Sequence, residues 1–250
     1  MSDSVHGSRS TLGWPLRLLN GAVKQLRTGS RLNEESLFSA AIKQTGLTDF
    51  GDPHFRQGLT SLIESAENDA KLHFIGRRVM NTLITVFLVN RLLLAETRKR
   101  RPEIFRTPLL PPLVILGLPR SGTTFLHGML ALDPANQAIP AWQTMRPIAN
   151  SKPDRRKQTY HWENKAQSLL IPKLDRMHYS RTDTPEECVI LFGTTFVSAI
   201  FSTCAPVYGY QDWLNSQDRL MAYREYLALL QIIQYPNPSL RFALKSPAHT

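Results

Sequence analysis

An apolar run, a glycine-rich turn and a second apolar run follow one another between residues 113 and 132. The run "LVIL" has the length and composition of a buried strand, and a helix is expected over 123–132. Between them lies "GLPRSGTT", from Gly117 to Thr124. A turn of this kind leaves backbone N–H groups open at the positive end of a helix dipole. The chain is therefore predicted to contain an α/β unit that holds a phosphate-bearing compound.

This turn departs from the common nucleotide-triphosphate loop at one position. That loop reads G-x-x-x-x-G-K-[ST], and its lysine stabilises the β- and γ-phosphates. Here both glycines are in register, but Thr123 stands in the lysine position. The backbone cradle is kept, whereas ATP hydrolysis is disfavoured. Arg120, inside the turn, offers a charged, forked donor for one phosphate or for a neighbouring sulfuryl group.

The rest of the chain supplies the other parts of an α/β layer fold. "LRFAL", residues 240–244, is expected to be a second short buried strand. We therefore predict a P-loop-like parallel sheet flanked by helices, with a helical N-terminal region. The predicted divisions are a basic arm over 1–33, a helical region over 34–106 and the α/β domain over 107–250. Helices are expected over 34–45, between Asn33 and Gly46, and over 55–97, 160–170, 185–203 and 216–235, with a surface excursion over 135–158.

Net charge and cysteine content indicate the class of binding partner and the cellular compartment. The formal charge of +10 at pH 7 favours an anionic partner, but charge alone does not choose among nucleotide, sulfated substrate, nucleic acid and lipid headgroup. The two cysteines, Cys188 and Cys204, are expected to be buried free thiols in a reducing compartment. Because the first 30 residues contain no continuous apolar core of a secretory signal, we expect a cytoplasmic protein.

Three further segments have structural explanations beside functional ones. "LITVFLVNRLLLA", residues 83–95, is too short for a membrane span and contains Asn90 and Arg91, so a buried or amphipathic helix is expected. "RKRR", residues 98–101, suits the C-terminal end of a helix, and no nucleic-acid-binding module accompanies it. We predict no nucleic-acid partner. The basic N-terminal arm is compatible with peripheral contact to an anionic membrane surface and equally with a loosely held arm.

The motif "PRSGTT", from Pro119 to Thr124, resembles the 5′-phosphosulfate loop of sulfotransferases, whose pattern is P-[KR]-[SG]-G-T-T. Further segments are similar to a bacterial-type branch of that family: "TGLTDFGDPHFRQGL", "DTPEEC", "YQDWL" and "LKSPAH". The resemblance spans residues 45–250. It implies an enzyme that moves a sulfuryl group from 3′-phosphoadenosine-5′-phosphosulfate (PAPS) to a hydroxyl group, by in-line displacement and without a metal. The acceptor would be a small molecule, a lipid or a carbohydrate.

The resemblance also implies which residues bind PAPS. Lys245 of "LKSP" is similar to a lysine that neutralises the leaving group in related tyrosylprotein sulfotransferases. A lysine at the C-terminal end of a parallel strand also faces the crevice where α/β folds bind ligands. The structural alternative is a surface lysine that extends from the end of the strand. The residues that would hold the 5′-phosphosulfate are Arg120, Ser121, Gly122, Thr123 and Thr124.

The predicted site lacks the catalytic carboxylate that is usual in the family. Relatives usually carry a carboxylate in a "WE" pair after the loop helix, and here Trp142 is followed by Gln143. An amide orients a hydroxyl group but does not take its proton. His249, which follows Lys245 closely, is our preferred candidate, ahead of His178.

Three other ionisable side chains have structural explanations. Glu186 and Glu187 lie in "TPEEC", where helix capping explains both: Thr184 fits an N-cap, Pro185 the first helical position and Glu187 the reciprocal capping residue. His127, one turn beyond Thr124, is expected to pack beneath the loop. No spacing of His, Cys and carboxylates suggests a metal site.

The family's segment for the 3′-phosphate of PAPS would follow residue 250, so we expect the α/β domain to be incomplete at its C-terminus. Two functions therefore stay open beside the enzyme. One is a shortened relative that binds nucleotide or a partner protein without turnover, which Gln143 favours. The other is a P-loop NTPase or kinase, which Thr123 disfavours. The oligomeric state is not determined by the sequence.

Overall fold

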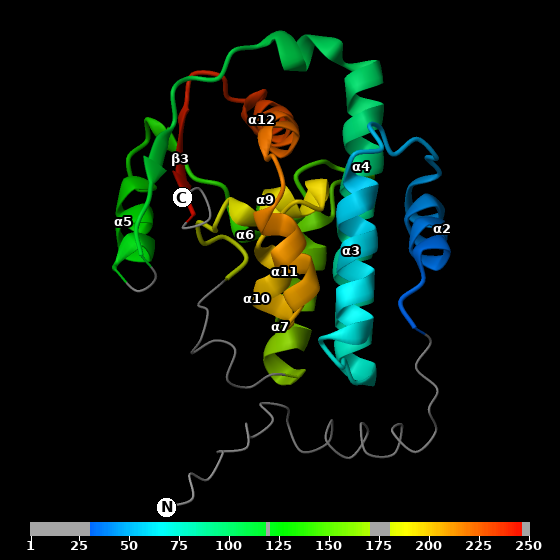
Figure 1. Ribbon diagram of the computed structural model, residues 1–250. Helices are drawn as coiled ribbons and strands as arrows, with labels where there is room; N and C mark the ends of the chain where they lie inside the picture. The colour runs from blue at the N-terminus through cyan, green and yellow to red at the C-terminus, as the bar shows by residue number, and fades with distance from the viewer. Residues whose placement is uncertain (1–30, 119–120, 171–180, 247–250) are drawn as a thin grey trace, which may run out of the picture.

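The computed structural model describes residues 31–118, 121–170 and 181–246. Figure 1 shows helices α2, α3 and α4 on one side of the molecule and strand β3 with helix α5 on the opposite side, and helix α12 lies between them. We call α2, α3, α4 and α12, together with the short helices over 189–215, the helical body. We call β1, β3, α5 and the turn between β1 and α5 the sheet corner. The bounds of these elements are α2 (Glu34–Thr45), α3 (Phe55–Asn68), α4 (Phe74–Arg100), β1 (Leu113–Ile115), α5 (Thr123–Leu130), α12 (Leu220–Gln234) and β3 (Arg241–Lys245).

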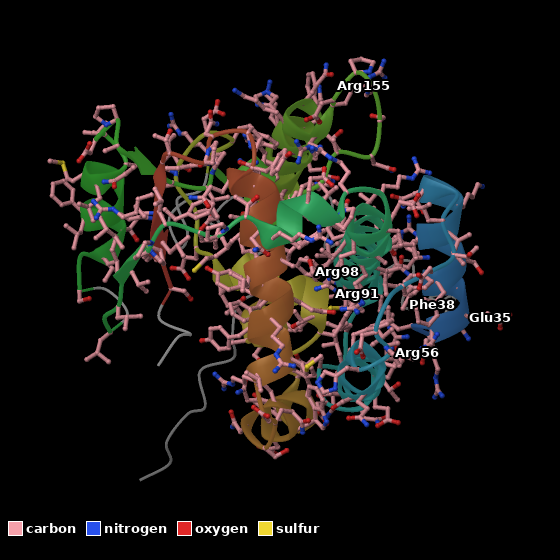
Figure 2. The ribbon with its side chains drawn as sticks, turned by 90° about the horizontal axis from the view of Figure 1, so that it is seen from above. Glu35, Phe38, Arg56, Arg91, Arg98 and Arg155 are labelled. Atoms are coloured by element: carbon pink, nitrogen blue, oxygen red, sulfur yellow. The ribbon has the colours of Figure 1, made fainter. Side chains whose placement is uncertain are left out.

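Helix α2 begins and ends where the sequence indicates its caps. The Asn33 side chain accepts a hydrogen bond from the Ser36 N–H at 2.9 Å, and Gly46 ends the helix in the left-handed region at φ 71°. Helix α3 packs beside it, with the Arg56 guanidinium 4.8 Å from the ring centroid of Phe38 (Figure 2). The helix predicted over 34–45 is confirmed.

The helical stretch expected over 55–97 is two helices rather than one. After α3, the Asp69 carboxylate accepts hydrogen bonds from the Ser65 hydroxyl and from the N–H of Gly209, which lies in α11 (Tyr208–Asn215). Helix α4 then begins after His73, whose Nδ1 accepts from the Gly76 N–H at 3.0 Å. Asp69 is thus held by a residue of another helix, while His73 caps the start of a new one, and the helical stretch is divided between them.

Helix α4 is a buried helix, as expected. Asn90 and Arg91 are 1% and 2% exposed. Although α4 is long and apolar enough to cross a membrane, 72% of its most apolar window is buried inside the protein. The cations of "RKRR" make structural contacts at its end: Lys99 Nζ lies 2.6 Å from Asp49 Oδ2, and Arg98 lies 5.9 Å from the ring centroid of Phe105.

A parallel sheet of three strands confirms the predicted fold class. The third strand is β2 (Asn136–Gln137), and the order is β1-β3-β2. In this register Ile115 lies opposite Lys245, and Asn136 lies opposite Arg241. The surface excursion expected over 135–158 is corrected in part, because β2 and helix α6 (Ala141–Met145) lie within it. A two-residue strand is too short to carry an alternating pattern in the sequence.

The helix expected over 185–203 is replaced by short helical segments. At Gly193 a Cβ would lie 2.2 Å from Phe87 Cζ of α4, and Phe196 has a left-handed φ of 57°. The ring of Phe87 occupies the space that a side chain at Gly193 would need, and the left-handed backbone at Phe196 ends this helical segment. The remaining elements are η1 (Pro102–Arg106), α7 (Arg156–Leu170), α9 (Val189–Phe192), η2 (Gly193–Thr195) and α10 (Ile200–Cys204), and α12 begins later than the expected residue 216.

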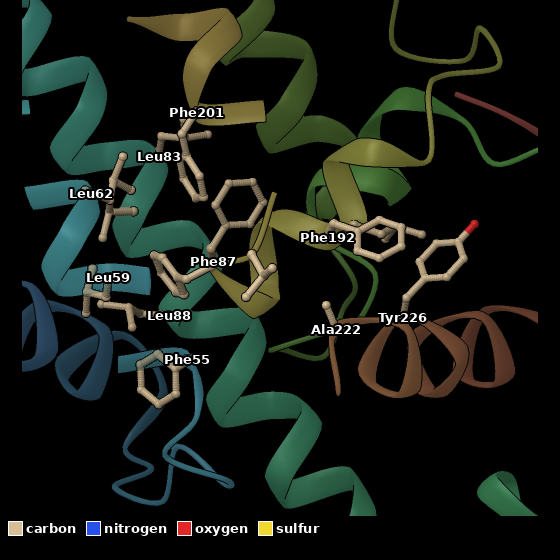
Figure 3. Packing of buried hydrophobic residues seen from close by; sticks show 14 of the residues in the cluster. Phe55, Leu59, Leu62, Leu83, Phe87, Leu88, Phe192, Phe201, Ala222 and Tyr226 are labelled. Carbon is tan, nitrogen blue, oxygen red and sulfur yellow. The ribbon is translucent and has the colours of Figure 1, made fainter. Parts of the chain in front are cut away.

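Aromatic side chains fill much of the core. Phe87 meets Phe201 edge-on with ring centroids 5.6 Å apart, and Phe192 stacks on Tyr226 of α12 at 4.4 Å (Figure 3). These contacts join α4 to the later helices in one cluster of buried hydrophobic residues. The helical body therefore owes its cohesion to contacts between segments far apart in the chain.

The sheet corner is much more open than the helical body. Several large apolar side chains lie at the surface there. Leu118 in the turn, Phe125 in α5 and Leu132 just beyond α5 are 80%, 76% and 77% exposed.

The burial of the two cysteines differs in part from expectation, because Cys188 is buried but Cys204 is exposed.

Candidate functional site

Two glycines close the turn after β1. A Cβ at Gly117 would lie 2.9 Å from both Ser121 Oγ and Thr123 Cγ2, so no larger residue fits without a shift. Gly122 has a φ of 84°, which residues with a side chain rarely adopt. The Ser121 N–H and hydroxyl both donate to the carbonyl of Leu118, at 3.2 and 2.7 Å. The turn is thus shaped by backbone geometry that only glycine provides.

Helix α5 presents an uncapped N-terminus directly after this turn. Gly122 is its N-cap and has no side chain with which to bind the first N–H groups of the helix. The first N–H groups of a helix have no acceptor within the helix and carry the positive end of its dipole. Ser121, Gly122 and Thr124 are exposed. The arrangement suits an anionic ligand.

Lys245, the last residue of β3, lies beside the start of α5. Because β1 and β3 are parallel and Ile115 pairs with Lys245, both strands end at the same edge of the sheet. Lys245 is only 6% exposed, and its Nζ donates to Thr124 Oγ1 at 3.0 Å. The ammonium group is therefore a buried cation at the turn rather than a surface lysine.

Glu187 is the second partner of Lys245, a contact that the sequence did not indicate. Lys245 Nζ donates to Glu187 Oε1, forming an ion pair. Among the described residues, these two contacts are the partners found for the ammonium group. A buried ammonium needs a counter-charge, and Glu187 supplies it.

The helix cap expected at Thr184 is wrong. Its hydroxyl donates to the Arg181 carbonyl and accepts from the Arg181 N–H, both at 2.9 Å, and α9 begins only at Val189. The segment before α9 instead runs beside the sheet, since the Glu186 N–H donates to the Ile139 carbonyl and the Cys188 N–H to the Lys245 carbonyl. Non-local backbone contacts hold this segment, so Glu187 is free of any capping role.

His127 packs beneath the turn, as expected. Its Nε2 lies 3.0 Å from the carbonyl oxygen of Ala243 in β3, and the residue is 2% exposed. Burial lowers the pKa of the imidazole, and the positive charge of Lys245 lowers it further. His127 is therefore a neutral support between α5 and β3.

The structure brings together five of the residues predicted to bind the nucleotide. Arg120 and the two histidines considered as bases, His178 and His249, lie outside the described residues. Gln143 lies in α6, where its N–H donates to the Pro140 carbonyl at 2.8 Å. Within the described ranges, no group of three or more His, Cys, Asp or Glu could hold a metal ion. The five residues are Ser121, Gly122, Thr123, Thr124 and Lys245.

An open groove of about 1120 Å³ lies between α7 and the segment over 181–184. The segment leads directly to Glu187, three residues beyond Thr184. Trp162 is 59% exposed in this groove, and Lys165 Nζ lies 5.3 Å from its ring centroid. Its basic and aromatic lining comprises Lys157, His161, Trp162, Lys165 and Arg181.

Comparison with known proteins gives consistent results. A family model described as the sulfotransferase family matches residues 111–250. Among solved structures, the chain is similar to sulfotransferase STF1 from Mycobacterium tuberculosis H37Rv, with 26% identity and a TM-score of 0.75 over 88% of this chain and 62% of that one. It is also similar to sulfotransferase STF9 from Mycobacterium avium, with 25% identity and a TM-score of 0.75 over 87% and 57% of the two chains. The chain thus spans about three-fifths of the length of these proteins. A search of curated proteins found no match.

Proposed function

Because the matching model covers more than half of its residues, this chain belongs to the sulfotransferase family, and we propose that it transfers a sulfuryl group from PAPS to a hydroxyl acceptor. One observation carries the proposal. The uncapped N-terminus of α5 and the buried Lys245 ammonium meet at one edge of the sheet, joined through Thr124. Backbone N–H groups and a cation that converge in this way suit an anion with several charged oxygens.

The residues present fit the donor nucleotide. PAPS supplies an activated sulfuryl group with a phosphate as its leaving group. Because Gly117 has no side chain, Ser121 and Thr123 can pack closely against it at the start of α5. We propose that the N–H groups over 121–124 and the Arg120 guanidinium hold the 5′-phosphosulfate. Lys245 then stabilises the negative charge that develops on the leaving phosphate.

The acceptor is proposed to enter from the groove beside α7. Its exposed Trp162 and neighbouring Lys165 combine a flat apolar face with a cation. Such a lining suits a hydroxyl-bearing small molecule, a lipid headgroup or a carbohydrate. The groove ends at Thr184, three residues before Glu187 in the chain, and we propose that an acceptor bound there extends its hydroxyl group along this segment toward Lys245.

A second function, nucleotide or partner binding without turnover, is favoured by Gln143, which stands where we expected a carboxylate. A protein of that kind would bind the nucleotide and leave PAPS intact. The third possibility, a P-loop NTPase or kinase, requires Mg·ATP binding and is disfavoured by Thr123 in the lysine position.

Thermal unfolding separates these functions. Adenosine 3′,5′-bisphosphate, the product nucleotide, should raise the melting temperature without magnesium, whereas Mg·ATP should not. At a ligand concentration of 100 Kd the stabilisation is about 2.7 kcal/mol. Stabilisation by Mg·ATP alone would contradict both the enzyme and the binding-only relative. Sulfated product formed from PAPS and a panel of hydroxyl acceptors then distinguishes the enzyme from the binding-only relative.

Single variants test the site itself. Arg120→Ala and Lys245→Ala should each abolish the shift caused by the product nucleotide, because each removes a cation from the cradle. Lys43→Ala, which removes an exposed cation from α2, is the matched control and should leave the shift intact. An undiminished shift in the Lys245 variant would place the nucleotide elsewhere.

A further inference from the structure

Glu187 is the carboxylate that the fold brings to the sheet corner. We propose that Glu187, rather than His249, is the proton acceptor for the hydroxyl group that attacks the sulfuryl donor, an inference that rests on the proposed function. Its Oε1 accepts from Lys245 Nζ, which also donates to Thr124 Oγ1 at the start of α5. The carboxylate therefore lies within two hydrogen bonds of the cradle.

The two oxygens of this carboxylate have different surroundings. Oε1 is held by Lys245, whereas no hydrogen bond to Oε2 is found within the described residues. The Glu187 side chain is 24% exposed, against 8% for Lys245. One oxygen thus holds the side chain in place, and the partial exposure of the side chain leaves room for a proton donor to approach the other, as a proton acceptor requires.

The other titratable groups packed around Glu187 and Lys245 are poorly suited to this role. The Glu186 carboxylate accepts the Glu187 N–H at 2.9 Å and is buried. His127 is held by the Ala243 carbonyl, and burial lowers its pKa. Burial raises the pKa of the Cys188 thiol to about 11, and the negative charge of Glu187 adds to this effect. All three of these side chains are buried. Glu187 is partly exposed, so it is the group that an acceptor hydroxyl could approach.

Nucleotide binding would alter the balance of charge at Glu187. In the nucleotide-free protein its carboxylate is the counter-charge of Lys245. A bound anion competes for the same ammonium group and adds negative charge nearby. Both changes loosen the contact between Lys245 and the carboxylate and place negative charge beside it, so that Glu187 is freed to accept the proton of a hydroxyl group. Binding of the donor therefore prepares the base.

The transfer step then balances without a further reagent. The acceptor oxygen forms a bond to sulfur as the bond from sulfur to the bridging phosphate oxygen breaks, and that electron pair stays on the phosphate. The hydroxyl proton passes to Glu187 Oε2. Lys245 stays protonated and stabilises the negative charge on the leaving phosphate.

Proton linkage tests this role without turnover. Binding of adenosine 3′,5′-bisphosphate is measured by calorimetry at mildly acidic pH in two buffers of different ionisation enthalpy. The wild-type chain should take up a fraction of a proton, at most about one, per nucleotide bound. Glu187→Gln should bind the nucleotide and lose this uptake. Glu67→Gln is the matched control, because Glu67 is also a partly buried, ion-paired glutamate, 3.1 Å from Arg77, in the helical body.

Each outcome decides between the proposals. Uptake that is lost in Glu187→Gln and kept in Glu67→Gln supports the role of Glu187. Nucleotide binding without proton uptake, or uptake that persists in Glu187→Gln, overturns it and leaves the sulfotransferase proposal standing. Absence of nucleotide binding in the wild-type chain overturns the proposed function itself.

Turnover of PAPS gives a second readout. Glu187→Gln should lower kcat by about 10²- to 10⁴-fold with little change in the KM for PAPS, and the acidic limb of its pH profile should disappear. Glu187→Asp should recover part of the rate, because it keeps the carboxylate. A His249→Ala variant that loses the same limb while Glu187→Gln keeps it would assign the base to His249.

Discussion

Two ion pairs of this molecule use the same chemistry in different surroundings. In the helical body, Arg91 of α4 donates to both oxygens of the Glu225 carboxylate, at 2.7 and 3.0 Å. The same guanidinium donates to the carbonyls of Thr194 and Asp52 and lies 4.0 Å from the ring centroid of Phe55. Figure 2 shows Arg91 among the side chains of the helical body. These contacts hold the Arg91 guanidinium in one position.

At the sheet corner the pair is less complete. Among the described residues Lys245 has two partners for its three donor hydrogens, and the Glu187 side chain is 24% exposed. A buried pair whose donors are nearly all satisfied specifies packing, whereas one with spare donor and acceptor capacity can exchange partners when an anion arrives. The contrast predicts that the stability of the fold depends on the Arg91–Glu225 pair, whereas ligand binding depends on the Lys245–Glu187 pair.

Breaking the pair in the helical body is expected to have the largest effect. Arg91→Met leaves the Glu225 carboxylate buried without a counter-charge and should lower the free energy of unfolding by about 3–5 kcal/mol, measured by urea denaturation. The double variant Arg91→Met with Glu225→Leu should recover most of this loss. Glu187→Gln should cost less than Arg91→Met, because Glu187 is partly exposed and an amide oxygen can still accept from Lys245, although the buried ammonium loses its counter-charge. Equal losses for the two single variants would contradict the comparison.

Removing the same side chain from each region sharpens the contrast. Leu88 of α4 is fully buried, whereas Leu132, just beyond α5, is 77% exposed. Leu88→Ala should cost about 2–5 kcal/mol, since it removes buried methyl groups and leaves a cavity. Leu132→Ala should stay within about 0.5 kcal/mol of the wild type. A loss of more than 2 kcal/mol at Leu132 would show that α5 is covered in solution.

The smallest effect is expected from pH. Burial lowers the pKa of His127 below its ordinary value of 6.5, so the folded state favours the neutral imidazole. Its contribution to stability is complete above pH 6.5 and is lost as the pH falls below that value, at no more than about 1.4 kcal/mol per pH unit. His127→Gln should remove this part of the acid dependence in urea denaturation, while His54→Gln, at an exposed position, should keep it.

Much of the site could be predicted because it rests on local rules. The caps at Asn33 and Gly46, the strand–turn–helix unit around Gly117 and Gly122, and the strand that ends at Lys245 each follow from a short stretch of sequence. Parallel strands end at one edge of the sheet, so the meeting of Lys245 with the turn also follows from the order of the elements.

Other features depend on contacts that no local pattern contains. Asp69 closes α3 by binding Gly209, which is 140 residues away in the chain. The left-handed backbone at Phe196 interrupts a buried apolar run whose composition favours a helix, and β2 is too short to be seen without its partner strand. The motif "TPEEC" satisfies every rule for a helix cap, yet backbone bonds to Ile139 and Lys245 hold that segment along the sheet.

The amino-acid order by itself determined that a glycine-containing turn forms between a strand and a helix, because glycine spacing and apolar runs act over a few residues. Only the three-dimensional packing decided that Glu187 neutralises Lys245. The burial of a lysine and the carboxylate that compensates its charge depend on segments 58 residues apart, and charge compensation in the interior is a property of the assembled fold.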